Sequence, residues 1–499
     1  MRWGTLRSLA GSALAVLLLG QLVVADIPIE VSSTGIPHPN SYLAPTQLYP
    51  ALPSSTQLHP ALTQLLPSSY YRVASTVLPP DLAGKEIAAP MMTFYAQNQT
   101  EGIPGKLTDT WYVAGAMFMT LIQYWQASGD DQYNSIVSHD LMFQAGRNYD
   151  FFDSNYSRWL GNDDQMFWGL AAITASETGF PEIENKPTWT TLARAVFNMQ
   201  ANRWDMSACN GGINWQIHAW QKGNKLRNSI SNGGLFQLAA RLGRFTENST
   251  YFEFAEKIWD WSVDSPLITP DQDWFVADST TGQSNCTESG NMQWSYNYGS
   301  YLAGCAFMYN ATGDEKWLRA TTGLLARLET TFFPAEYDHS VMSEVSCEKL
   351  HTCDRNMLCF KGWTAMWMAL TANLVPQTRA TIVPKLQGSA AAIGRQCDGE
   401  SENLCGSRWY QDTWDGIKGL EVQMAALGGI TSNLMLMTEA TAKTINTNPD
   451  AKEQHLETHD DDPAILRTIT TGDRVGSWIL TAAWSIGILS AAWWLVRQD

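Results

Sequence analysis

Tyr296–Tyr309 (YNYGSYLAGCAFMY) and the turn that follows it, Thr312–Trp317 (TGDEKW), carry the pattern that decides the fold. The first segment is apolar nearly all round, which is typical of a helix buried on every side. In the turn, Gly313 and Asp314 are suited to stop that helix and cap the next, and Trp317 begins a new apolar stripe. The stretch therefore predicts a buried helix joined by a short turn to a second helix.

Two other segments repeat this turn, Ser128–Tyr133 (SGDDQY) and Thr246–Tyr251 (TENSTY). The first of them follows another all-apolar stretch, Tyr112–Trp125. The helix after the second is amphipathic, because its charged residues lie opposite three apolar ones, Phe254, Ile258 and Trp261. A helix buried on all sides paired with a one-sided helix is an αα-hairpin with an inner and an outer member.

Further all-apolar stretches occur at Gln165–Ala175, Gly362–Ala372 and Gly419–Leu434. A repeated hairpin forms either an open solenoid or a closed toroid. The helical segments suffice for about six pairs, which favours closure. We therefore predict an all-α fold, an (α/α)6 barrel, in which the inner helices and their connections line a cleft at one end.

The composition of the chain limits the classes of function that it can have. The 499 residues include 49 acidic and 32 basic ones, a net charge of −17, which argues against a nucleic-acid partner. Hydrophobic residues make up 44%, enough for a large core. The 22 Trp, 17 Tyr and 17 Phe suit a helical core and also suit sugar binding, in which flat rings stack on pyranose C–H faces.

Both ends of the chain carry targeting patterns. Met1–Ala25 has a short basic start and an apolar run, as in a secretory signal peptide. Ser477–Val496 is apolar and fits either the removable tail of a glycosylphosphatidylinositol (GPI) anchor signal, which we favour, or a bilayer span. The predicted organisation is a signal peptide at 1–25, a Pro/Ser-rich disordered segment at 26–82, the barrel at 83–440, a polar acidic stalk at 441–475 and the hydrophobic tail at 476–499.

The sequons and the cysteines of the chain are consistent with secretion. Five Asn-x-Ser/Thr sequons begin at Asn98, Asn155, Asn248, Asn285 and Asn310. Eight cysteines in a secreted chain indicate disulfides rather than zinc. The close pairs Cys347/Cys353 and Cys397/Cys405 could each staple a loop, whereas Cys305 lies in an apolar helix and suits a buried thiol.

The strongest chemical candidate is Gly161–Gly169 (GNDDQMFWG), where Asp163 and Asp164 begin an inner helix. Such residues can simply cap the helix. Glycosidic cleavage, however, needs two carboxyl groups, one ionised and one protonated, and neighbouring aspartates split their pKa values because like charges disfavour double ionisation. Motifs for serine hydrolases, zinc proteases and nucleotide binding are absent from the sequence, so we expect no metal and no cofactor.

From Met91 to Leu434 the chain resembles glycoside hydrolase family 76, in its fungal GPI-anchored branch of mannan endo-1,6-α-mannosidases. The segments that carry the resemblance are Gly105–Leu107, Ala114–Phe118, Gly161–Gln165, Trp168–Gly169, Trp204–Asp205, Gly211–Gly212, Trp215–Ile217, Asn228–Gly233, Gln293–Asn297, Phe360–Gly362, Trp414–Gly416 and Glu421–Ala426.

The resemblance implies an (α/α)6 barrel and a retaining mechanism on α-1,6-linked mannose, with Asp163 as nucleophile and Asp164 as general acid/base. Within the matching segments we expect the substrate to contact seven side chains, those of Trp168, Trp215, Asn232, Gln293, Trp294, Tyr296 and Lys361. The branch implies a secreted protein anchored on the outer face of the plasma membrane or in the cell wall. Its expected partners are a mannose-containing glycan, GPI-anchored proteins and a β-glucan acceptor.

One departure from the family pattern is Val113, where the family usually has Glu, so any polar role there is lost. Three functions stay open on sequence grounds. The first is hydrolysis or transglycosylation of an α-1,6-mannosyl glycan during wall biogenesis. The second is non-catalytic mannan binding on the same scaffold, which would not require both aspartates. The third is a purely structural wall protein, in which the cleft would be filled.

Overall fold

The computed structural model describes residues 71–73, 76–78, 80–108, 110–152, 160–400, 403–438, 442–454 and 471–496. The chain divides into two compact units, Met1–Gln57 and Leu58–Asp499, and every described residue belongs to the second. The predicted signal peptide at 1–25, and the predicted segment at 26–82 up to residue 70, lie outside the described residues.

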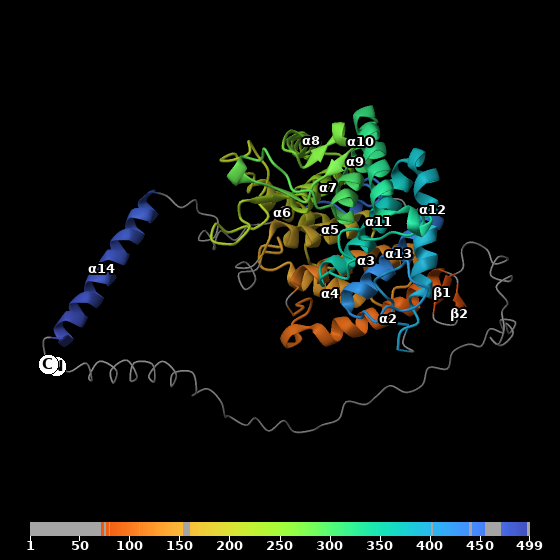
Figure 1. The fold of residues 1–499 in the computed structure, drawn as a ribbon, viewed down its shortest axis with the longest axis horizontal. Helices are drawn as coiled ribbons and strands as arrows, with labels where there is room; N and C mark the ends of the chain where they lie inside the picture. Colours follow the sequence, from red (N-terminus) through yellow and green to blue (C-terminus); the bar gives the residue numbers. More distant parts are fainter. Residues whose placement is uncertain are drawn as a thin grey trace, which may run out of the picture. The chain divides into compact units, whose positions relative to one another are not determined.

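An inner ring of helices forms the centre of the fold (Figure 1). Within the described residues, its members are α3 (Trp111–Ser128), α5 (Asn162–Thr178), α7 (Ser229–Thr246), α9 (Ser295–Thr312), α11 (Phe360–Leu374) and α13 (Leu420–Met437). Each inner helix packs against the next, and α13 packs against α3, which closes the ring. Their side chains are buried nearly all round, as the apolar stretches require.

An outer layer covers this ring. Its helices are α2 (Pro80–Asn98), α4 (Asn134–Gln144), α6 (Trp189–Ala201), α8 (Ser249–Asp264), α10 (Glu315–Phe332) and α12 (Arg379–Arg395). Each helix from α4 onward packs on the inner helix before it, while α2 packs on α13, so the first and last hairpins meet. The predicted all-α (α/α)6 barrel is confirmed.

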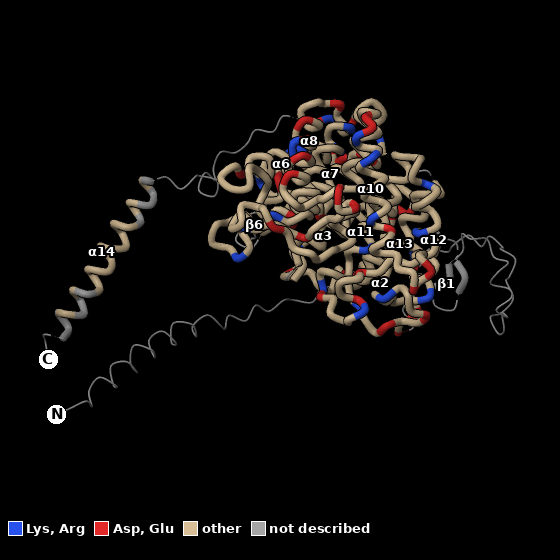
Figure 2. The backbone as a smooth tube through the Cα atoms, turned by 45° about the horizontal axis from the view of Figure 1, so that its top comes forward, with Lys and Arg blue, Asp and Glu red and all other residues tan. Residues whose placement is uncertain are grey.

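Charged residues of both signs are interspersed over the outer helices and connections (Figure 2). One example joins neighbouring outer helices, where Lys316 of α10 pairs with Glu256 and Asp260 of α8 at 2.8 and 3.1 Å. The inner helices carry few charges because they have no solvent-facing side.

Short turns join α3, α7, α9 and α11 to the outer helices that follow them, whereas residues 179–188 join α5 to α6. Gly129 and Gly313 adopt left-handed conformations (φ 77° and 68°), and their N–H groups donate to the carbonyls of the last turns of α3 and α9. The Asp314 carboxylate then accepts from the N–H of Lys316 and caps α10. These are the turns that the repeated sequence predicted, and we call this end of the barrel the short-turn end.

Long connections lead into the inner helices at the opposite end, which we call the long-connection end. They comprise residues 99–110, 145–161, 202–228, 265–294, 333–359 and 396–419. Because inner and outer helices alternate in direction, the inner helices all begin here. The partial positive charges of their N-termini therefore converge on one region, which favours anionic groups there.

Disulfides tie these connections. Cys347–Cys353 and Cys397–Cys405 each close one connection, as predicted from their spacing. Cys209–Cys286 joins two different connections, those before α7 and before α9. Cys305 is a buried free thiol, as expected, and so is Cys359.

The described residues also form three two-stranded antiparallel sheets. The antiparallel pairs are β1 (Tyr71–Val73) with β2 (Thr76–Leu78), β3 (Leu226–Asn228) with β6 (Ser279–Thr281), and β4 (Ile268–Thr269) with β5 (Phe275–Val276). Strand β1 lies against α12 and α2, and α2 begins at Pro80. Ordered packing thus starts before the predicted boundary at residue 83.

The boundary predicted at residue 440 is also displaced. Residues 442–454, expected in a stalk, pack on the short-turn end of the barrel. The N–H of Lys443 donates to the carbonyl of Glu177 at 2.7 Å, and Glu453 pairs with Arg194 of α6 at 3.2 Å. The segment is polar, but its polar groups find partners on the barrel and Ala451 is fully buried.

Helix α14 (Thr471–Val496) covers most of the predicted C-terminal tail. None of the helices in the described part of the chain is long and apolar enough to cross a membrane.

A buried ion pair joins α5 to α7. Arg241 donates to one carboxylate oxygen of Glu177 through Nε (3.0 Å) and Nη2 (2.6 Å), and both side chains are almost inaccessible. We expect Arg241→Met to lower the free energy of unfolding by about 3–5 kcal/mol, because it leaves a buried carboxylate unpaired. Denaturant titration measures this, and a loss below about 1 kcal/mol would contradict the importance of the pair.

Candidate active site

Asp163 and Asp164 lie in the first turn of α5 at the long-connection end, and both side chains are half-buried. The N–H of Gly161 donates to Asp164 Oδ2 at 2.6 Å, and the N–H of Asp164 donates to Asp163 Oδ1 at 3.1 Å. Both carboxylates thus help to cap the helix. Capping does not account for the remaining contacts of Asp163, which come from outside α5.

The two carboxylates differ in how many donors they face. Besides the N–H of Asp164, Asp163 accepts from Asn228 Nδ2 at 3.4 Å and from the Trp215 indole, whereas Gly161 is the one donor to the Asp164 side chain in the described residues. Burial raises the pKa of Asp163 to about 6 against the opposing effect of its hydrogen bonds. Burial, followed by repulsion from Asp163, raises the pKa of Asp164 well above its usual range. Because hydrogen-bond donors favour the ionised form of a carboxyl group, these contacts favour ionisation of Asp163 over Asp164.

Aromatic side chains from four inner helices form a cluster near the pair. Tyr112 of α3 lies 5.4 Å from Phe167 of α5, and Phe167 lies 4.4 Å from Trp363 of α11, measured between ring centroids. Tyr296 of α9 stacks on Phe360 at 3.7 Å. Burial and the charges of nearby acids, the two aspartates among them for Tyr112, raise the pKa of both tyrosines, which keeps them neutral. Phe167, Trp363 and Phe360 are buried, whereas Tyr112 and Tyr296 are half-buried, so the two tyrosines are the rings of this cluster that could contact a sugar.

Two more acids, the half-buried Asp278 and the fully buried Glu344, lie within electrostatic reach of Tyr296. Asp278 accepts from Asn297 Nδ2 at 3.3 Å, and burial raises its pKa. Glu344 is fully buried and accepts from both the N–H and the hydroxyl of Ser295 at the start of α9. Burial raises the pKa of Glu344 to about 8, so this residue is a protonated acid at neutral pH.

The structure brings two of the predicted substrate-binding residues to the carboxylates. Trp215 bonds to Asp163, and Tyr296 lies close enough for the charge of Asp163 to affect its pKa. Trp294 is buried edge-on against Phe360, with ring centroids 5.8 Å apart. Gln293 is half-buried and accepts from the Tyr298 hydroxyl at 2.6 Å.

The other three predicted binding residues are corrected. Trp168 is fully buried and stacks on Trp111 (4.9 Å) and Phe151 (5.3 Å), so it is a core residue. Asn232 is buried, with its amide bonded to the backbone of Ile213, which explains its position without a ligand.

Lys361 is also buried. It pairs with Glu348 and donates to the Ser407 carbonyl at 2.8 Å, and its ammonium group lies 4.2 Å from the Trp409 ring centroid. The positive charge of Lys361 is thus balanced by Glu348 inside the protein, and it also acts on the nearby Glu344.

Sequence reasoning missed Asn228, Tyr112, Asp278 and Glu344 as residues of the site. One usable signal was position: Asn228 immediately precedes α7, just as Gly161 precedes α5, and Tyr112 lies in the first turn of α3. Asp278 and Glu344 lie within long connections, and no local pattern marks them.

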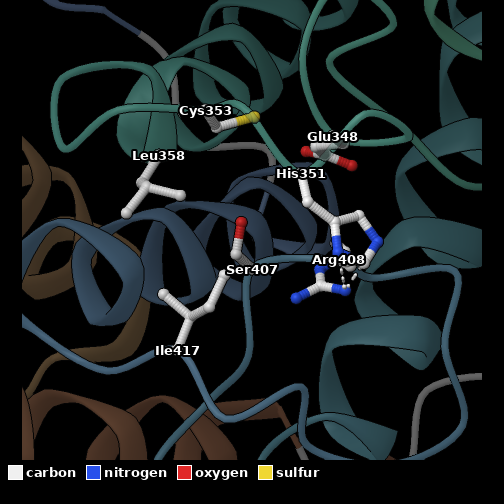
Figure 3. A pocket seen from close by; sticks show the side chains of 7 residues that line it. All are labelled: Glu348, His351, Cys353, Leu358, Ser407, Arg408 and Ile417. Carbon is white, nitrogen blue, oxygen red and sulfur yellow. Dashed lines mark hydrogen bonds between the residues drawn. The ribbon is translucent and has the colours of Figure 1, made fainter.

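A pocket with an empty volume of about 330 Å³ opens at the long-connection end (Figure 3). Its lining comes from two disulfide-closed connections and consists of Glu348, His351, Cys353, Leu358, Ser407, Arg408 and Ile417. Arg408 Nη1 donates to the His351 ring at 3.1 Å. The lining includes neither aspartate. In the described ranges, no group of three or more His, Cys, Asp or Glu side chains is placed to hold a metal ion.

An (α/α)6 barrel with paired carboxylates among aromatic rings is an architecture of glycoside hydrolases. The chain belongs to glycosyl hydrolase family 76, which its residues 81–446 match. The predicted family, and with it the prediction of a glycoside hydrolase, is confirmed.

Two curated relatives match along most of their length. The mannan endo-1,6-alpha-mannosidase DCW1 of Saccharomyces cerevisiae is 37% identical over 415 residues, which are 82% of this chain and 91% of the relative. The mannan endo-1,6-alpha-mannosidase DFG5 of Candida albicans is 34% identical over 422 residues, 83% and 92% of the two chains.

Solved structures agree in fold. The crystal structure of Dfg5 from Chaetomium thermophilum, in complex with glucosamine, has a TM-score of 0.71 and 35% identity and covers 78% of this chain and 96% of that one. The GH76A α-1,6-mannanase of Salegentibacter has a TM-score of 0.58 at 17% identity, covering 71% and 99%, and supports the fold alone.

Proposed function

We propose that this protein is a retaining endo-α-1,6-mannosidase or transglycosidase of the cell surface, acting on α-1,6-mannosyl glycans in fungal cell-wall biogenesis. The observation that carries the proposal is the unequal surroundings of Asp163 and Asp164: Asp163 accepts from more donors, and burial together with repulsion from Asp163 raises the pKa of Asp164. The names of the relatives support the linkage and the sugar.

In the proposed first step, a carboxylate oxygen of Asp163 attacks the anomeric carbon of a mannosyl residue. The bond from that carbon to the glycosidic oxygen breaks, and Asp164 gives its proton to the departing oxygen. Asp163 is then esterified and Asp164 ionised. In the second step an acceptor hydroxyl gives its proton to Asp164 and attacks the same carbon, which restores both groups.

The acceptor decides the reaction. Water gives hydrolysis, and a sugar hydroxyl gives transglycosylation. The proposed donor is a mannose-containing glycan, mannan or the glycan of a GPI-anchored protein, and the proposed sugar acceptor is wall β-glucan. Mass spectrometry of products formed from an α-1,6-manno-oligosaccharide, with and without added glucan oligosaccharides, separates the two reactions.

The proposed roles predict a bell-shaped pH dependence of kcat/KM for α-1,6-manno-oligosaccharide cleavage. Activity should rise with pH through about 6, as Asp163 loses its proton, and fall at higher pH, once Asp164 is ionised. The measurement is the initial rate of cleavage at low substrate concentration across pH 4–9. Failure to cleave at any pH, with the oligosaccharide still bound, would favour the non-catalytic mannan-binding function.

We also propose a GPI anchor at the C-terminus, from the tail pattern at 476–499. A phospholipase specific for glycosylphosphatidylinositol should release the protein from fungal membranes. Mass spectrometry of the mature chain should find no peptide containing Trp493 and Trp494. Recovery of that peptide would contradict the anchor.

A further inference from the structure

The first turn of α5 is held from outside by the end of α6. Arg203, two residues beyond α6, donates from the same Nη1 atom to Asn162 Oδ1 and to Gln165 Oε1, both at 2.7 Å. Gln200, in the last turn of α6, donates to the Asn162 carbonyl at 2.6 Å. Asn162 and Gln165 are the residues immediately before and after the two aspartates, so Arg203 brackets the pair.

Asn162 also holds the Trp215 segment. Its N–H donates to the Trp215 carbonyl at 2.9 Å, and its Nδ2 donates to the Asn214 carbonyl at 2.7 Å. With Arg203 on Oδ1 and Gln200 on its carbonyl, every polar group of this buried side chain and backbone unit has a partner. A displacement of Asn162 would therefore move Asp163 relative to the Trp215 indole that bonds to it.

Placing the positive charge of Arg203 beside the N-terminus of α5 costs free energy. A positive charge beside a helix N-terminus is opposed by the helix dipole, and burial lowers the pKa of Arg203 to about 10. Its Nε and Nη2 atoms are buried without hydrogen-bond partners in the described residues. Phe152 lies beneath the guanidinium, 4.8 Å from its Cζ to the ring centroid. A neutral side chain could donate to the same side-chain oxygens of Asn162 and Gln165 at a lower desolvation cost. It would lack the rigid, planar guanidinium group of arginine.

We propose that Arg203 is a positioning residue, which acts through Asn162 and Gln165 to hold Asp163 against its donors Trp215 and Asn228, so that Asp163 and not Asp164 is the ionised member of the pair. The inference rests on the proposed function, because it assigns a residue to the same reaction. It differs from a role in stability, since it concerns which aspartate carries the charge.

Within the described residues, four charged or titratable groups besides Asp163 face this arrangement. Asp150, in the connection before α5, faces Arg203 and partly offsets its charge. Asp164 faces Asp163. Tyr112 of α3 and Tyr296 of α9 face the pair and are neutral.

The test compares Arg203→Met and Arg203→Lys with the wild-type enzyme in pH profiles of kcat/KM on an α-1,6-manno-oligosaccharide. Arg203→Met should lower kcat about 10–100-fold with little change in KM, because a small misplacement of reacting groups has an effect of this size. The acidic limb should move to higher pH, since Asp163 loses donors. Arg203→Lys keeps the positive charge but lacks the planar guanidinium group. It should lower kcat and move the acidic limb to higher pH, each by less than Arg203→Met does.

Arg241→Met is the matched control, because it removes another buried arginine that contacts α5, four turns from the aspartates. This variant should lose stability but keep the wild-type acidic limb and the wild-type kcat per folded molecule. Folded Arg203 variants with wild-type kcat and limb would overturn the proposal. If Arg203→Met does not fold, Arg203→Lys decides alone, a shifted limb supporting the proposal and an unshifted one overturning it.

Failure of the proposed function gives a different result. In that case the wild-type enzyme itself cleaves no α-1,6-mannoside, and the proposal is tested by carbon NMR titration of the labelled aspartates. The Asp163 resonance should titrate at higher pH in Arg203→Lys than in wild type, and equal titration points would overturn the positioning role.

Discussion

Asp163→Ala should lose turnover of an aryl α-mannoside by about 10⁴-fold or more, and added azide should restore part of it with β-mannosyl azide as the product. The loss is large because this side chain forms the covalent bond in the proposed mechanism. Azide fills the space left by the carboxylate and attacks from the nucleophile's face, so the configuration at the anomeric carbon inverts. Product configuration by proton NMR is the measurement.

The matched control is Asp163→Asn, which keeps the shape and the capping oxygen of the side chain. It should be equally inactive, should not be rescued by azide, and should unfold within about 1–2 kcal/mol of the wild type. Wild-type activity in either variant would remove Asp163 from the mechanism and leave capping as its role.

Asp164→Ala should give the opposite configuration. With an aryl mannoside whose leaving group needs little protonation, formation of the glycosyl-enzyme stays fast and its breakdown slows. With an α-1,6-manno-oligosaccharide, whose leaving group needs the proton, turnover should fall about 10²–10⁴-fold. Azide should enter from the face of the missing acid/base group and attack the ester on Asp163, giving α-mannosyl azide with retained configuration.

Rapid-quench kinetics should show a burst of aryl alcohol in this variant, since the covalent intermediate accumulates. If azide gave the same anomer in the Asp163 and Asp164 variants, the two roles would not be separable. If Asp164→Ala gave the β-azide and Asp163→Ala the α-azide, the assignments would be exchanged.

The ring of inner helices could be predicted because burial on every side is a local property of a sequence. An all-apolar stretch such as Tyr296–Tyr309 has no solvent-facing stripe, and the Gly and Asp of the next turn mark where it ends. The position of the aspartate pair followed from the same reasoning, since the residues that begin an inner helix lie at its open end.

Because these helices are apolar on every side, the sequence does not show which of their side chains reach the site. A helix that is apolar all round has no amphipathic phase, so nothing in the sequence distinguishes Tyr112, which is half-buried near the aspartates, from Trp168, which is fully buried between α3 and α5. Asn232 and Lys361 lie one turn or less inside their helices and are buried for the same reason.

Contacts between segments that are distant along the chain could not be predicted from the sequence either. Asn228 is 65 residues from Asp163 along the chain, and its role depends on how two connections fold over one another. The tail at 442–454 was misjudged because composition describes side chains, whereas much of its binding uses backbone groups and a single ion pair.

The docking of residues 442–454 places the end of the catalytic domain far from the aspartates. Lys443 meets the last turn of α5, whereas the aspartates occupy its first turn, so the helix of 17 residues, about 25 Å long, separates the two. Residue 454 therefore lies toward the end of the barrel opposite the aspartates, and an anchor attached beyond it, as we propose, would be joined to the barrel from that opposite end.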